Sequence, residues 1–125
     1  MLYSKNTGYR VKFYKNSKSG KIPVLEYIES QSAKEQQKIL KYIEVLRQNK
    51  GCLPQPYSKH IKNKIWEMRI DFSRRRHRIF YFILIGKTII LLNAFLKKTP
   101  KTPLPEIKKA ENRYIDALNN KYLYE

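Results

Sequence analysis

Cysteine, glycine and acidic residues are all scarce in this chain. Cys52 is its only cysteine, which excludes a disulfide framework and a cysteine-based zinc site. The four glycines form no phosphate-binding fingerprint. His60 and His77 have no Asp, Glu or Cys at metal-ligand spacing. The sequence therefore predicts a protein that binds no metal and needs no cofactor.

Long apolar runs are missing as well. The most apolar stretch, residues 88–96, is far shorter than the roughly 20 residues that a membrane-spanning helix needs. Residues 1–5 contain no apolar core of a signal peptide. We therefore expect a cytoplasmic protein with no membrane partner.

Charge is strongly one-sided. The 125 residues include 27 Lys and Arg but only 10 Asp and Glu, which gives a net charge of +17. Such a charge repels itself and favours an oppositely charged partner. Nucleic acid is the first choice, followed by an acidic protein and then an anionic membrane; a solvated basic surface is the alternative. The length and the 42% apolar content predict one domain over residues 1–125.

Residues 65–101 organise the chain. Residues 65–72 alternate apolar and charged side chains, as a strand with one buried face does. Residues 76–83 form a second strand-like run. Residues 88–96 are nearly all apolar, which is typical of a strand buried on both faces.

The connection between the first two strands decides which arginines meet. If Ser73 and Arg74 form a tight hairpin tip, Arg78 lies opposite Arg69. One more loop residue puts His77 opposite Arg69 instead, and the sequence at the break favours neither. Like charges directly opposite each other are unfavourable, so paired arginines predict an anionic partner.

The remaining elements complete the fold. We expect a strand at residues 9–14, helices at 22–29, 32–49 and from about 102, and an irregular connection at 52–63. The order strand, two helices, three antiparallel strands and helix predicts an α+β fold. It is a small antiparallel β-sheet flanked by helices, which we expect on one side of the sheet.

The basic residues are concentrated where the strands are. Residues 59–101 contain twelve Lys and Arg but only two acidic residues. Arg can bind a phosphate with two hydrogen bonds and Lys acts as a point charge, with an affinity that falls as salt rises. Interleaved aromatic rings can stack on bases, but we expect Trp66, Phe80 and Phe82 in the core.

Glu67 has two possible roles. It can form a structural salt bridge to Arg69 or Arg78, or it can be a carboxylate in a cationic pocket that orients a group or takes a proton. RNA carries its own nucleophile, the 2′-hydroxyl, so an enzyme need only align it, assist proton transfer and stabilise charge. This chemistry suits a chain that has no clear nucleophile of its own.

Several segments resemble the HigB-type branch of the RelE/ParE toxin superfamily, which includes phage-derived HigB-like toxins. They are residues 65–69 (IWEMR), 78–81 (RIFY) and 91–103 (LLNAFLKKTPKTP), with Glu106, Ala110 and residues 19–24 (SGKIPV). The similarity spans almost the whole chain. Asn93 and Ala94 stand where that branch has His-Gly, so a mechanism with an imidazole at position 93 is not expected, and His77 can replace it only if the register allows.

The resemblance implies a toxin of a type II toxin–antitoxin system, an mRNA interferase that inhibits translation and arrests growth. Its partners would be mRNA in the 30S ribosomal A site and a cognate antitoxin, a HigA-like helix-turn-helix protein. The residues implied as catalytic are Glu67, Arg69, Arg78 and Lys98. The residues expected to contact RNA are Lys62, Arg76, His77, Lys97 and Lys101.

Two other functions remain open at this point. A ParE-like toxin inhibits DNA gyrase and needs no such set of residues around a phosphate. A non-catalytic RNA- or ribosome-binding module needs positive charge but not arginine in particular, so replacing Arg78 by Lys would matter little.

Overall fold

The computed structural model describes residues 8–125; residues 1–5, for which no signal core is predicted, lie outside them. The elements are β1 (Arg10–Phe13), α1 (Pro23–Glu29), α2 (Ala33–Gln48), β2 (Ser58–Lys62), β3 (Ile65–Phe72), β4 (Arg75–Leu84), β5 (Thr88–Leu96), α3 (Leu104–Asn119) and the 3₁₀ helix η1 (Lys121–Tyr124). Among residues 8–125, no helix is long and apolar enough to cross a membrane.

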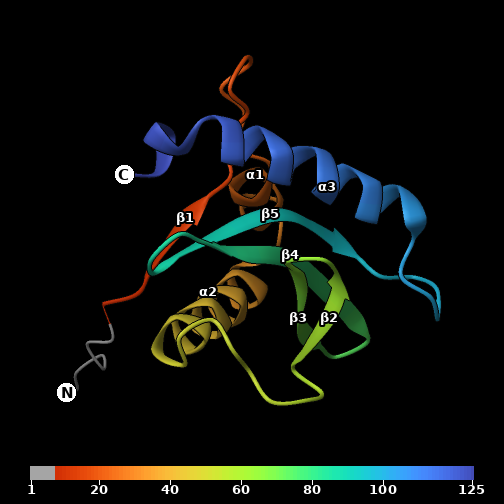
Figure 1. Ribbon diagram of the computed structural model, residues 1–125. Helices are drawn as coiled ribbons and strands as arrows, with labels where there is room; N and C mark the ends of the chain where they lie inside the picture. The colour runs from red at the N-terminus through yellow and green to blue at the C-terminus, as the bar shows by residue number, and fades with distance from the viewer. Residues whose placement is uncertain (1–7) are drawn as a thin grey trace.

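The five strands form one mixed sheet in the order β1-β5-β4-β3-β2 (Figure 1). The predicted α+β fold is confirmed. The sheet is not wholly antiparallel, because β1 pairs in parallel with β5, while the other neighbours run antiparallel. The prediction of an irregular connection over residues 52–63 is wrong for the second half of that segment. There β2 pairs with β3 as an edge strand, and its sequence, SKHIK, has no apolar alternation that would reveal it.

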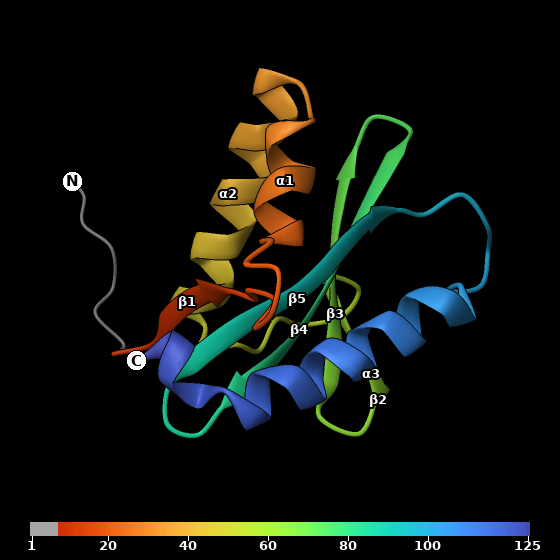
Figure 2. The same ribbon diagram turned by 90° about the horizontal axis from the view of Figure 1, so that it is seen from above.

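Helices cover both faces of the sheet, so the expectation of one covered side is wrong. α1 and α2 lie on one face and α3 on the other, as Figures 1 and 2 show. Each face of the sheet has its own hydrophobic core. In β5, Ile89 and Leu91 belong to the first core, which packs against α1 and α2, and Ile90 and Leu92 belong to the second core, which packs against α3. A strand that is apolar on both faces needs cover on both faces, which is the physical reason for the two layers.

The β3–β4 hairpin has a two-residue tip at 73–74. Its register places Arg78 opposite Arg69 and pairs His77 with Ile70, which confirms the tight hairpin over the alternative. Seen from above, the tip of this hairpin extends beyond α3 (Figure 2). The end of the hairpin is therefore left open on the face that α3 covers elsewhere.

The expected aromatic core is correct for two residues of three. Phe80 and Phe82 are buried against α3, whereas Trp66 is 39% exposed. Trp66 pairs with His60 of the edge strand β2, and their ring centroids lie 5.2 Å apart. Trp66 therefore lies next to the edge strand, outside the hydrophobic core that packs against α1 and α2.

Candidate functional site

Arg78 is almost buried at the open end of the hairpin, with 6% of its surface exposed. Its Nη1 donates to Asp71 Oδ1 at 2.8 Å and to the His77 carbonyl at 3.0 Å. Its Nε is buried and has no hydrogen-bond partner among residues 8–125. Leaving such a donor unpaired is costly, and an anion bound beside Arg78 would satisfy it.

Glu67 is fully buried on the same face of β3. Arg69 Nε donates to Glu67 Oε1 at 3.0 Å, and Thr102 Oγ1 donates to Oε2 at 3.5 Å. The salt bridge considered for Glu67 is therefore present and joins it to Arg69; Arg78 pairs with Asp71 instead. Glu67 fixes the orientation of Arg69 and ties the segment before α3 to the sheet.

Lys97 belongs to the same group of charges. Partial burial lowers the pKa of Lys97, and the neighbouring cations Arg78, Arg69 and Lys59 lower it further, while Glu67 acts in the opposite direction. The backbone places Lys97 there, because its amide donates to the Arg76 carbonyl at 2.8 Å and the preceding Leu96 pairs with His77 of β4. We call Lys59, Glu67, Arg69, Arg78 and Lys97 the cationic group.

Two adjoining cavities surround the end of the hairpin and share Asp71. The larger has a volume of about 700 Å³ and holds five cations and one carboxylate. It is lined by Asp71, Ser73, Arg74, Arg75, Arg76, Leu96, Lys97 and Lys98. The smaller, of about 270 Å³, is lined by Lys38, Tyr42, Pro56, Tyr57, Arg69, Asp71 and Arg78. Basic side chains line both cavities, which suits a phosphodiester chain. We call the two cavities together the groove.

Most, but not all, of the predicted site residues come together. Arg76 and Lys98 are exposed in the larger cavity, and Lys101 is exposed on the segment before α3. Lys62 lies apart: it ends β2 and pairs with Glu111 of α3 at 3.0 Å. Lys59 was missed as an individual site residue because β2 carries no strand pattern from which its neighbours can be inferred.

His77 points to the opposite face and is completely buried. Its Nδ1 lies 2.6 Å from the Tyr27 hydroxyl and its Nε2 lies 2.7 Å from Glu35 Oε2. The structure thus places His77 in a buried link between α1, α2 and β4, which leaves neither ring nitrogen exposed for the expected RNA contact. Asn93 is also buried, and its Nδ2 donates to Glu106 Oε1 at 3.1 Å.

Glu35 is the centre of that link. Burial alone would raise its pKa, but hydrogen bonds from Arg75, His77 and Ser32 outweigh it and lower the pKa from 4.5 to about 2. A carboxyl group with a depressed pKa in the folded state stabilises the fold above its unfolded pKa. This contribution is lost as the pH falls through the folded value.

The pH dependence of stability tests this link. We expect the free energy of unfolding to fall as the pH drops from about 4.5 towards about 2, and we expect Glu35→Gln to flatten this part of the curve. Urea denaturation followed by circular dichroism measures it. Glu29→Gln, at an exposed position of α1, is the matched control. Equal slopes for wild type and Glu35→Gln would show that the link does not stabilise the fold.

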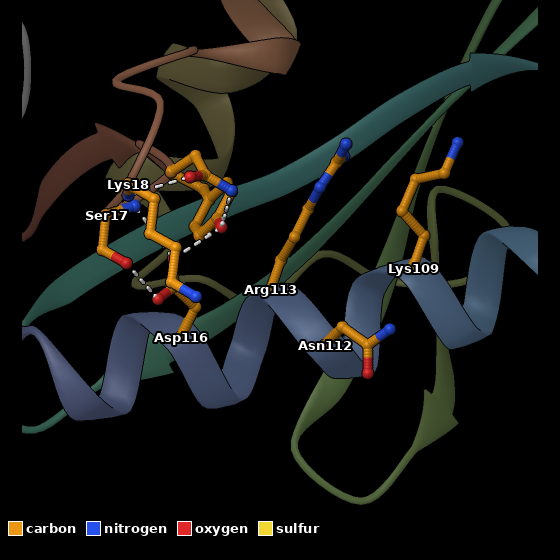
Figure 3. A pocket seen from close by; sticks show the side chains of 8 residues that line it. Ser17, Lys18, Lys109, Asn112, Arg113 and Asp116 are labelled. Carbon is orange, nitrogen blue, oxygen red and sulfur yellow. Dashed lines mark hydrogen bonds between the residues drawn. The ribbon is translucent and has the colours of Figure 1, made fainter.

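A separate polar pocket of about 350 Å³ lies between the loop after β1 and α3 (Figure 3). Asp116 of α3 accepts hydrogen bonds from Ser17 Oγ at 2.6 Å and from the Tyr14 hydroxyl at 2.6 Å. Arg113 donates to the Leu92 carbonyl at 3.2 Å. These internal contacts fasten the loop to α3 and indicate a structural role.

The model of the family described as phage-derived protein Gp49-like (DUF891) matches residues 26–115, from α1 into α3. The matched stretch contains the whole cationic group and both cavities that surround it. A search of curated proteins found no match.

Proposed function

Because the chain belongs to the phage-derived Gp49-like family, whose proteins are toxins of the RelE/ParE type, we propose that it is a ribosome-dependent mRNA endoribonuclease of a type II toxin–antitoxin system. The observation that carries the proposal is the placement of three cations at one end of the sheet: Arg69, which pairs with the buried Glu67, lies opposite Arg78, and the Lys97 amide bonds to the carbonyl of Arg76 on the same strand as Arg78. Gyrase inhibition requires no such arrangement.

The reaction uses the substrate's own nucleophile. The 2′-oxygen of the ribose attacks the adjacent phosphorus and loses its proton to water, and the bond from phosphorus to the 5′-oxygen breaks. The products are a 2′,3′-cyclic phosphate and a 5′-hydroxyl, so the leaving oxygen must receive one proton. Arg69 and Arg78 neutralise the charge that develops on the phosphoryl oxygens.

In this proposal Lys97 donates the proton to the leaving oxygen, whereas the resemblance implies Lys98 as the catalytic lysine and Lys97 as an RNA contact. An ammonium with a lowered pKa transfers its proton more readily than an ordinary lysine. Glu67 is a positioning residue, because its carboxylate is shielded and holds Arg69. Arg76 and Lys98, which are exposed in the larger cavity, and the exposed Lys101 contact the phosphates on either side of the scissile one.

The net charge of +17 suits two partners of this function. Ribosomal RNA around the A site is polyanionic and attracts the basic surface over long range. A cognate antitoxin, an acidic or helix-turn-helix protein, neutralises the toxin by covering the same surface.

End-mapping of cellular RNA after induced expression tests the proposal. We expect new 5′-hydroxyl ends and 2′,3′-cyclic phosphates within translated mRNA, together with arrested growth and normal plasmid supercoiling. Intact mRNA with continuing translation would contradict the proposal. Relaxed or broken plasmid DNA would assign the protein to gyrase inhibition.

A further inference from the structure

A fourth cavity shares two lining residues with the smaller cavity of the groove and differs from it in character. It has a volume of about 470 Å³ and opens between α2 and the loop that leads to β2, the yellow and yellow-green segments of Figure 1. Its lining is Lys41, Tyr42, Val45, Asn49, Leu53, Pro54 and Tyr57, without an acidic residue. Tyr42 and Tyr57 also line the cavity that contains Arg69 and Arg78.

The two shared tyrosines form the boundary between the apolar and cationic cavities. Their ring centroids lie 6.3 Å apart at an interplanar angle of 63°. Tyr57 is 47% exposed, which is a large apolar surface to leave in water. Lys38 Nζ lies 5.8 Å from the Tyr42 ring centroid, so the aromatic surface carries a cation at its edge.

The backbone holds Tyr57 next to Arg69. The Tyr57 carbonyl accepts a hydrogen bond from the Arg69 amide at 2.9 Å, and the Tyr57 amide donates to the Pro54 carbonyl at 2.9 Å. The bond to Arg69 extends the β2–β3 pairing by one residue before the start of β2, and the bond to Pro54 closes a turn in the preceding loop. The backbone of Tyr57 is therefore held at the edge of β3, opposite Arg69.

An apolar aromatic cavity that adjoins a cationic one matches the structure of a nucleotide, in which a flat base is attached next to a phosphate. Across the two cavities the lining contains four cations, Lys38, Lys41, Arg69 and Arg78, and one acid, Asp71. An apolar protein segment would gain nothing from these cations. A single-stranded polynucleotide uses both the aromatic surface and the charge.

We propose that the cavity lined by Tyr42 and Tyr57 is a base-binding subsite, in which Tyr57 stacks on the RNA base that flanks the phosphate held by Arg69 and Arg78. The inference rests on the proposed function for the position of that phosphate, and it adds the substrate class of the subsite: an unpaired base in a single strand. Stacking accepts every base, so the subsite selects single-stranded over double-helical RNA rather than a particular sequence.

Binding of RNA that cannot be cleaved tests the subsite apart from catalysis. Two fluorescein-labelled oligonucleotides of equal length are compared by fluorescence anisotropy: a fully 2′-O-methylated single-stranded RNA, and the same backbone with abasic residues. We expect Tyr57→Ala to weaken binding of the first by about tenfold and to leave the second unchanged. Tyr57→Trp should bind the first at least as well as the wild type.

Tyr122→Ala is the matched control, because Tyr122 is 65% exposed in η1 and lines none of these cavities. Thermal melting of each variant monitors folding. If Tyr57→Ala loses the same affinity for both oligonucleotides, or loses affinity for neither, the proposed subsite is overturned. In the second case the groove would be a surface for a protein partner. If Tyr57→Ala binds both normally while mRNA is still cleaved in cells, the inference fails and the proposed function stands.

Discussion

Arg78→Ala is expected to abolish growth arrest and to lower the rate of mRNA cleavage by about 100-fold or more. Arg78 lines the smaller cavity of the groove, and removing it leaves the negative charge that develops on the phosphoryl group without that guanidinium. Arg78→Lys should also be severely impaired, because a lysine cannot donate two parallel hydrogen bonds from a planar group. Single-turnover cleavage on purified translating ribosomes measures both variants.

Lys108→Ala controls for the loss of a positive charge, because Lys108 is exposed on α3 outside both cavities of the groove. The ion pair that Arg78 loses involves a carboxylate that is 60% exposed, and pairs of this kind add little to stability. Thermal melting should therefore show both variants folded. Normal cleavage by Arg78→Lys would contradict a catalytic role and favour a binding module that needs charge alone.

Lys97→Ala is expected to have the second-largest effect, a loss of about 100-fold in cleavage. If Lys97 acts as the acid, activity falls as the pH rises through its pKa, which burial and neighbouring cations set below 10.5. Lys97→Arg, which stays protonated, should shift this basic limb of the pH–rate profile to higher pH. The measurement is the single-turnover rate as a function of pH.

Lys98→Ala is the comparison for this experiment, since Lys98 lines the same cavity but is exposed. It should weaken RNA binding with a smaller effect on the cleavage step. A larger loss of cleavage for Lys98→Ala than for Lys97→Ala, with an unchanged basic limb in Lys97→Arg, would transfer the role of proton donor to Lys98.

The sequence predicts the centre of the fold well because its physical signals are local. Alternation over residues 65–72 predicts β3 and the residues that share each of its faces. The sequence leaves two registers open for the hairpin, and the structure selects the two-residue tip that pairs Arg69 with Arg78. The capping residue Ser32, whose hydroxyl accepts from the Glu35 amide at 3.2 Å, opens α2 as predicted.

What the sequence does not predict depends on contacts between distant residues. β2 has no apolar alternation and exists because β3 offers an edge with which it can pair. His77 is buried because Glu35 and Tyr27, more than 40 residues away, supply partners for both ring nitrogens. No spacing in the sequence indicates these pairings.

The different roles proposed for the adjacent Lys97 and Lys98 also depend on tertiary structure. Successive residues of a strand point to opposite faces, but Lys97 and Lys98 follow β5, where that rule ends. Only the structure shows that the Lys97 amide bonds to the carbonyl of Arg76, on the strand that carries Arg78, and that Lys97 is partly buried whereas Lys98 is exposed. Similarly, Tyr57 lies in a loop whose composition indicates no role, and its position follows from the hydrogen bond to the Arg69 amide.

The most direct test of the account is a single change in the substrate. An mRNA that is cleaved at a mapped position on the ribosome is prepared with one 2′-deoxyribose on the 5′ side of the scissile phosphate, and is presented to the purified toxin. Because the 2′-hydroxyl is the nucleophile, we predict that cleavage at this position disappears while neighbouring sites are still cut. Unchanged cleavage of the deoxy-substituted mRNA would contradict the central claim that the cationic group makes the RNA strand cut itself.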